Sequence, residues 1–202
     1  SLGEDFRGLR ESLEGVWRDI PMAEGPRVLL VTSPSHHADD RTDVSVGLAQ
    51  AFAETGSRVT LVDGDLRSQT LTALLGTAGQ PGFTDVVKGT SSTRSVSRDT
   101  RLPGVRLLGA GTGVSNVGEA LSSGSLDGLV DPESDVVIID APQCSNVSDA
   151  TILSSVATDC LMVVPMGTVS ADELAAVLDR WSAVARPPSM VVATKVAPAD
   201  IL

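Results

Sequence analysis

VTSPSHHADDRTDVSVGLAQAFAETG, residues 31–56, decides the fold of this chain. The stretch begins in an apolar strand, continues through a short polar loop and opens an amphipathic helix near Thr42. This layout suits the binding of a phosphate, because the free backbone N–H groups at the start of a helix point toward an anion. The loop, however, reads HHADDRT instead of being rich in Gly and Lys. It is a nucleotide site with unusual chemistry, a site that has lost its chemistry, or an ordinary loop.

The composition narrows the class of protein. The 202 residues suffice for one full-sized α/β domain. The formal net charge of −11 disfavours nucleic acid or anionic lipid as a partner, because affinity for both comes mainly from cationic contacts to phosphate. Cys144 and Cys160 have neither the spacing of a metal site nor that of a disulfide framework. With no signal peptide and no apolar run near the ~20 residues of a membrane span, we expect a reducing, cytoplasmic setting.

Outward from this stretch, short apolar runs alternate with helical patterns. The runs are continuous, which is typical of strands buried on both faces of a parallel sheet. This alternation predicts an α/β fold with three layers and a doubly wound, mostly parallel sheet. Residues 90–104 have no apolar period and are predicted to form a surface loop. The predicted strands cover residues 27–33, 57–64, 105–111, 134–142, 159–166 and 189–196, and the predicted helices cover residues 42–56, 69–76, 116–130, 147–157 and 171–185.

An amino-terminal helix precedes this pattern. Apolar residues recur at steps of three and four along residues 2–20, which predicts an amphipathic helix. Pro21 and the Gly25-Pro26 pair then indicate a linker. We therefore divide the chain into residues 1–24, the helix and linker, and residues 25–202, the α/β domain. Leu13 and Trp17 are expected to pack on the body of the domain.

Carboxylates follow two of the predicted strands. Asp63 and Asp65 lie two residues apart, so their side chains point the same way, and Asp140 ends the apolar run VVIID. Many phosphate-transfer sites hold magnesium with such a residue, although a single Asp at a strand end more often caps the next helix. Because ligands of doubly wound sheets bind beyond the carboxyl ends of the strands, the coincidence of these residues favours a site.

These segments together resemble the cytoplasmic domain of the bacterial tyrosine kinases. These P-loop NTPase-like proteins belong to polysaccharide co-polymerase systems for capsule and exopolysaccharide export. EDFRGLR (4–10) is similar to the family's amino-terminal Glu-x-x-Arg-x-x-Arg helix, and LVDGDLRSQTL (61–71) to its second Walker-type segment. PGFTDVVKG (81–89) resembles its Gly-Leu-Ser-Asp-Val-Leu-x-Gly stretch, and DVVIIDAPQCSNVSDATIL (135–153) its Walker B strand with the residues that follow. The resemblance covers nearly the whole chain.

The chain departs from this family in the loop itself. The family's loop is Pro-Gly-Glu-Gly-Lys-Ser/Thr, and counting back from the helix places Arg41 at the Lys and Thr42 at the magnesium-bound hydroxyl. Ala38, Asp39 and Asp40 then replace Gly-Glu-Gly. Glycines let backbone N–H groups approach phosphates closely, whereas carboxylates repel a polyphosphate. The planar guanidinium of Arg41 is also a poor substitute for a compact ammonium. The Walker A loop is therefore degenerate.

We expect a pseudokinase domain with a structural or regulatory role, without catalytic residues and without an ATP, ADP or metal cofactor. The chain contains no Tyr, which is consistent with this expectation, because the family kinases phosphorylate tyrosines at their own carboxyl end. We also expect the Arg41 guanidinium to fill the phosphate site by pairing with the clustered strand-end carboxylates, which would otherwise repel one another. The vestigial site residues are Asp63, Asp65, Asp140, Arg41, Thr42 and Asp40.

Two enzymatic interpretations stay open. One is an active or residually active tyrosine autokinase or ATPase that depends on ATP and magnesium, with a divergent loop. The other is a partner-activated ATPase of the chromosome- and septum-positioning type, against which residues 4–10 and 81–89 and the SNVSDA stretch argue. An active enzyme would hold magnesium with Thr42, Asp63, Asp65 and Asp140.

The loop also contains residue types that bind zinc. A zinc ion could replace the missing nucleotide, but adjacent His residues rarely converge on one ion, and a solvated polar loop is the simpler interpretation. The candidate ligands are His36, His37, Asp39 and Asp40.

Three charged residues of the amino-terminal helix share one face. Glu4, Arg7 and Arg10 recur at three-residue steps, which fits a solvated face with an i,i+3 ion pair. The resemblance instead places this motif at the subunit contact of a ring-shaped homo-oligomer. It also implies a membrane-spanning co-polymerase portion as partner, in the same or another protein, and a location at the cytoplasmic face of the membrane.

Overall fold

The structure is a computed structural model that describes residues 2–20, 24–35, 40–112, 117–118, 121, 126–144 and 148–195. Within the described residues, no helix is both long enough and apolar enough to cross a membrane. In chain order the elements are α1 (Leu2–Arg18), β1 (Arg27–Thr32), α2 (Asp40–Ala53), β2 (Val59–Asp63), α3 (Thr70–Leu74), α4 (Phe83–Val87), α5 (Thr93–Val96), β3 (Arg98–Asp99), β4 (Val105–Leu108), the 3-10 helix η1 (Leu126–Leu129), β5 (Val136–Asp140), α7 (Ser148–Ser154), β6 (Asp159–Pro165), α8 (Ala171–Ser182) and β7 (Met190–Thr194).

The strands form a seven-stranded sheet in the order β3-β4-β2-β5-β1-β6-β7. Every pair is parallel except the short pair of β3 with β4. Since β1, β2 and β5 are neighbours, their carboxyl ends meet at one edge of the sheet. This is the fold class that the alternating pattern predicts.

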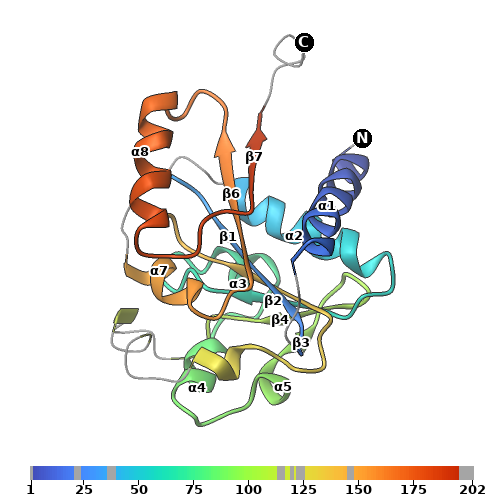
Figure 1. Ribbon diagram of the computed structural model, residues 1–202. Coiled ribbons are helices and arrows are strands. Elements are labelled where there is room, and N and C mark those ends of the chain that lie inside the picture. The colour runs from blue at the N-terminus through green and yellow to red at the C-terminus, as the bar shows by residue number, and fades with distance from the viewer. Residues whose placement is uncertain are drawn as a thin grey trace.

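Two hydrophobic cores cover the two faces of the sheet. Successive residues of β1 alternate between them: Val28 and Leu30 join the core under α4, α7 and α8, while Leu29 and Val31 join the core under α1 and α2. In Figure 1, α8 lies on one side of β6 and β7, and α1 lies on the other. A strand with apolar neighbours on both faces needs a continuous apolar sequence, which explains the runs in the chain.

The amino-terminal helix belongs to this packing. Leu13 is fully buried, and Trp17 stacks on Phe52 of α2 with ring centroids 5.3 Å apart. The Arg27 guanidinium, at the start of β1, lies over the Trp17 ring and donates to the carbonyl oxygen of Trp17 at 2.8 Å. The expectation that Leu13 and Trp17 pack on the domain is confirmed, and α1 shares its hydrophobic core with α2 and the sheet.

The structure differs from the sequence-based prediction at several elements. Residues 90–104 do not form a plain loop, because Ser92 and Ser95 cap each other around the start of α5, and β3 pairs with β4. Residues 81–89 contain α4, and α2 begins at Asp40 rather than Thr42. β7 is an edge strand whose side chains alternate between half-buried and exposed, so it is not buried on both faces. Seven of the 15 residues of the helix predicted over 116–130 lie outside the described part of the chain, and Leu126–Leu129 form the 3-10 helix η1.

Candidate functional site

The site lies where the carboxyl ends of β2 and β5 meet the start of α2. Asp63 and Asp140 end these two strands and are register partners in the parallel ladder. Both side chains are essentially inaccessible, with residue exposures of 0% and 1%. The prediction that the strand-end carboxylates come together is thus met for this pair.

Asp140 is surrounded by donors from the first turns of α2. The Thr42 hydroxyl donates to its Oδ2 at 2.6 Å, and the Ser45 hydroxyl lies 3.3 Å from its Oδ1. The Arg41 Nε donates to Oδ1 at 3.1 Å. Burial raises the pKa of Asp140, and the Arg41 guanidinium and Thr42 hydroxyl act against this rise. The ion pair therefore offsets a desolvation cost.

Arg41 bridges two carboxylates. Besides Asp140, its terminal nitrogen contacts the Asp65 Oδ2 at 3.0 Å, and its side chain is only 10% exposed. The other Asp65 oxygen accepts a hydrogen bond from the Ser68 backbone at 3.2 Å. The expectation that Arg41 turns inward to pair with the strand-end carboxylates is confirmed for Asp65 and Asp140.

Asp63 has a different environment. Its Oδ2 accepts hydrogen bonds from the backbone and the hydroxyl of Thr72 at 2.7 and 2.6 Å. Its Oδ1 has no partner among the described residues. Burial raises the pKa of Asp63 to about 6, although the two bonds from Thr72 lower it. Unlike Asp65 and Asp140, this carboxyl has no ion-pair partner among the described residues.

Asp40 turns away from the strand-end carboxylates. The Thr194 hydroxyl at the end of β7 donates to its Oδ2 at 2.6 Å, and the Lys195 ammonium lies 2.9 Å from its Oδ1. Burial by itself would raise the pKa of Asp40, but these two groups outweigh it and lower the pKa. Asp40, placed by sequence counting in a phosphate loop, instead forms an ion pair with Lys195, which follows β7.

The site residues do not fit a magnesium ion while Arg41 holds its present position. Magnesium needs near-octahedral oxygen ligands at about 2.0–2.1 Å. One oxygen each of Asp140 and Asp65 is already bonded to the guanidinium, and the Thr42 hydroxyl donates its proton to the other Asp140 oxygen. Among the described residues, no group of three or more His, Cys, Asp or Glu side chains is placed to hold a metal.

The zinc hypothesis falls mostly on residues outside the described part of the chain, namely His36, His37 and Asp39. Cys144 and Cys160 are free, as the absence of a disulfide framework in the sequence indicates, and both are buried. Burial raises the pKa of the Cys144 thiol to about 11 and that of Cys160 to about 12, so neither supplies a thiolate near neutral pH.

Sequence reasoning missed four residues that contact the predicted aspartates, namely Ser45, Thr72, Thr194 and Lys195. Ser45 lies one helical turn after Arg41, so the i,i+4 rule points to it. Thr194 and Lys195 end a predicted strand, and the strand-end rule that selected the aspartates applies to them as well. Thr72, which holds Asp63 in place, carried no signal beyond its position in a short helix.

The charged face of α1 is used within the chain. The Arg7 Nε contacts Glu54 at 2.9 Å, and Arg10 is buried, with its guanidinium 3.4 Å from the carbonyl oxygen of Ala51. Arg10 also lies 3.2 Å from Glu11. The face is therefore not simply solvated, because Arg7 and Arg10 both contact groups of α2 or its end. The oligomer contact expected for Glu4, Arg7 and Arg10 remains a prediction.

No protein-family model matches the chain. The chain is 32% identical over 141 residues to the tyrosine-protein kinase ptk of Acinetobacter johnsonii, an alignment that covers 68% of this chain and 19% of that protein. It is 30% identical over 181 residues to the tyrosine-protein kinase wzc of Salmonella typhimurium, covering 88% of this chain and 24% of that one. It spans about a fifth to a quarter of the length of these curated relatives.

Solved structures give the same relationship in three dimensions. The structure matches the BceF tyrosine kinase domain with a TM-score of 0.79 and 27% identity, over 95% of this chain and 76% of that one. The match confirms the P-loop NTPase-like fold class, and the named relatives confirm the resemblance based on the sequence motifs.

Proposed function

This chain belongs to the bacterial tyrosine-protein kinase family, and we propose that it is a kinase-fold domain that has exchanged phosphoryl transfer for a structural or regulatory role. The domain would work at the cytoplasmic face of the membrane, joined to or bound by the membrane-spanning portion of a capsule or exopolysaccharide co-polymerase. There it would contribute to assembly, in a homo-oligomeric ring, without binding ATP.

One observation carries this proposal: Arg41 stands between Asp65 and Asp140, at 3.0 and 3.1 Å. In an active site of this fold, these carboxylates and the Thr42 hydroxyl face the magnesium ion and the phosphates. Here the guanidinium of Arg41 is hydrogen-bonded to both carboxylates. A magnesium–nucleotide complex would have to break two charge-assisted hydrogen bonds in a nearly dry site before it gained its own contacts.

Calorimetric titration of ATP and ADP, with and without magnesium, into the purified chain tests the proposal. The kinase domain of the Salmonella relative, titrated in parallel, is the positive control. We expect no heat from this chain at millimolar nucleotide. Micromolar, magnesium-dependent binding that Asp140→Asn abolishes would overturn the proposal and favour the alternative, an ATP-dependent autokinase or ATPase that uses Thr42, Asp63, Asp65 and Asp140.

A further inference from the structure

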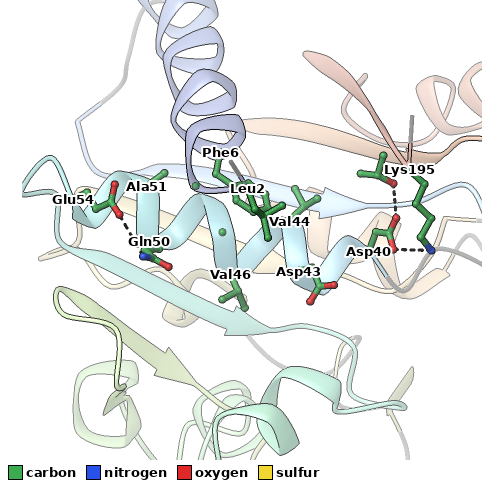
Figure 2. Close-up of a pocket in the computed structure, with 13 residues that line it drawn as sticks. Leu2, Phe6, Asp40, Asp43, Val44, Val46, Gln50, Ala51, Glu54 and Lys195 are labelled. Carbon is green, nitrogen blue, oxygen red and sulfur yellow. Dashed lines mark hydrogen bonds and ion pairs between the residues drawn. The ribbon is translucent and has the colours of Figure 1, made fainter. Parts of the chain in front are cut away.

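The first residue of α2 is tied to the end of β7. In Figure 2, the Asp40 and Lys195 side chains point toward one another across this contact. The Thr194 hydroxyl, 2.6 Å from the Asp40 Oδ2, and the Lys195 ammonium, 2.9 Å from its Oδ1, occupy both oxygens of the carboxylate. The Asp40 side chain is only 15% exposed, so little water competes for these charge-assisted contacts. We call Asp40, Thr194 and Lys195 the Asp40 latch.

The backbone at Lys195 is unusual. Its φ of 56° lies in the left-handed region, which residues other than Gly, Asn and Asp rarely adopt. Among the described residues, Gln69 is the one other non-glycine residue with a positive φ, and its backbone N–H donates to the carbonyl oxygen of Asp65 at 2.8 Å. Such conformations persist only where surrounding contacts hold them, and they cluster at active sites and switches. Both examples here contact an aspartate at the carboxylate site or at the start of α2.

The Asp40 latch acts on the residue next to Arg41. The Asp40 side chain reaches β7, whereas the Arg41 guanidinium reaches the carboxylates beyond β2 and β5 at 3.0 and 3.1 Å. Successive side chains of a helix are about 100° apart, so one turn of α2 makes both contacts. Because Asp40 and Arg41 share a peptide bond, a shift of Asp40 moves the backbone of Arg41. The two hydrogen bonds of the guanidinium then weaken, since they depend on distance and angle.

We propose that the Asp40 latch positions Arg41 in the carboxylate site, so that opening the latch at β7 releases the guanidinium and uncovers the carboxylates. The inference rests on the proposed function, in which Arg41 closes the site, and adds the contact that controls this closure. A simpler role for Asp40, interaction with the dipole at the start of α2, would not require a contact with β7 or a left-handed Lys195.

The test measures how fast the Arg41 Nε–H proton exchanges with water, by ¹⁵N NMR of the whole chain. The signal is identified by its loss in Arg41→Met, and exchange requires its hydrogen bond to open. Lys195→Asn removes the ammonium and keeps a residue type that tolerates a left-handed backbone. Since Lys195 is 60% exposed, we expect exchange to become about two- to fivefold faster. With Thr194→Val added, we expect it to become at least about tenfold faster.

Lys88→Asn is the matched control. Lys88 is the other lysine of the chain and lies exposed at the end of α4, so the variant has the same net charge as Lys195→Asn. We expect it to leave the exchange of the Arg41 proton unchanged. The backbone amides of Val137 and Ile139, which are fully buried in β5, report the stability of the whole fold. We expect their exchange to change little in every variant.

Two results would overturn the latch. Arg41 exchange in Lys195→Asn with Thr194→Val that matches the rate in Lys88→Asn would show that Arg41 keeps its place without these contacts. Equal acceleration at Arg41 and at the β5 amides would show a general loss of stability instead of a local release. Faster exchange at Arg41 alone supports the latch. The nucleotide titration decides the proposed function separately, because it is read from binding by the unmodified chain.

Discussion

Arg41→Met tests the internal ion pair most directly. The change removes the cation from Asp140, whose side chain is 1% exposed, and from Asp65, which is 14% exposed. Removing one partner of a buried pair costs about 3–5 kcal/mol, because the other charge stays buried without compensation. Asp140 keeps the hydroxyls of Thr42 and Ser45, so we expect the lower end, about 3 kcal/mol. For a domain of this size, that lowers the unfolding midpoint by about 6–12 °C.

The assay is thermal or urea unfolding followed by circular dichroism between pH 5 and pH 8. The defect is expected to shrink as the pH falls, because burial raises the folded-state pKa of Asp140 above its unfolded value, so the stranded Asp140 carboxyl takes up a proton in the folded state. Arg58→Met is the matched control. It removes the same side chain from the Arg58–Asp135 pair, which is 66% and 47% exposed, and we expect little change in the midpoint.

A second variant sharpens the test. Asp140→Asn combined with Arg41→Met removes both charges of the Arg41–Asp140 ion pair. This double variant is therefore expected to unfold at a higher temperature than the Arg41→Met variant alone. The reasoning is refuted if Arg41→Met unfolds at the midpoint of the unmodified chain at pH 7.5, or if its midpoint does not depend on pH more steeply than that of the unmodified chain.

Three further predictions concern other parts of the fold. Burial raises the pKa of Asp63 in the folded state from 3.8 to about 6. The free energy of unfolding is therefore expected to fall by roughly 2–3 kcal/mol as the pH rises through this range. Asp63→Asn should flatten that part of the dependence of urea unfolding on pH. Gly47→Ala pushes a methyl into the ring of Phe6 and should cost about 1–3 kcal/mol in urea unfolding, with Phe6→Leu in the same chain restoring part of the loss. Trp17→Ala removes the ring stacked on Phe52 and should cost about 3–5 kcal/mol; an unchanged midpoint would mean that α1 does not contribute to the core.

The site was only partly predictable from the sequence. The strand-end aspartates and the inward turn of Arg41 follow from local patterns and from the repulsion expected among clustered carboxylates. Which carboxylates Arg41 selects does not follow, since Asp140 lies 99 residues away in the chain and its place depends on the order of the strands. In the structure, Arg41 pairs with Asp65 and Asp140, whereas Asp63 accepts its hydrogen bonds from Thr72.

The charges at the start of α2 show the same division. Their residue types led us to predict a degenerate phosphate loop, whatever the fold around them. Only the packing of β7 beside β6 brings Thr194 and Lys195 to Asp40 across 154 and 155 positions of the chain. Likewise, only the close approach of α1 to α2 buries Arg10, which its helical spacing alone would leave in solvent.

The sequence by itself determined the layers of this protein, because continuous apolar runs and amphipathic periods are properties of neighbouring residues and indicate which faces must be buried. It also determined that the loop lacks the glycines and lysine of a phosphate site. The tertiary structure decided where each charge goes, since an ion pair forms between groups that folding brings together, and its strength depends on how completely the surrounding residues exclude water.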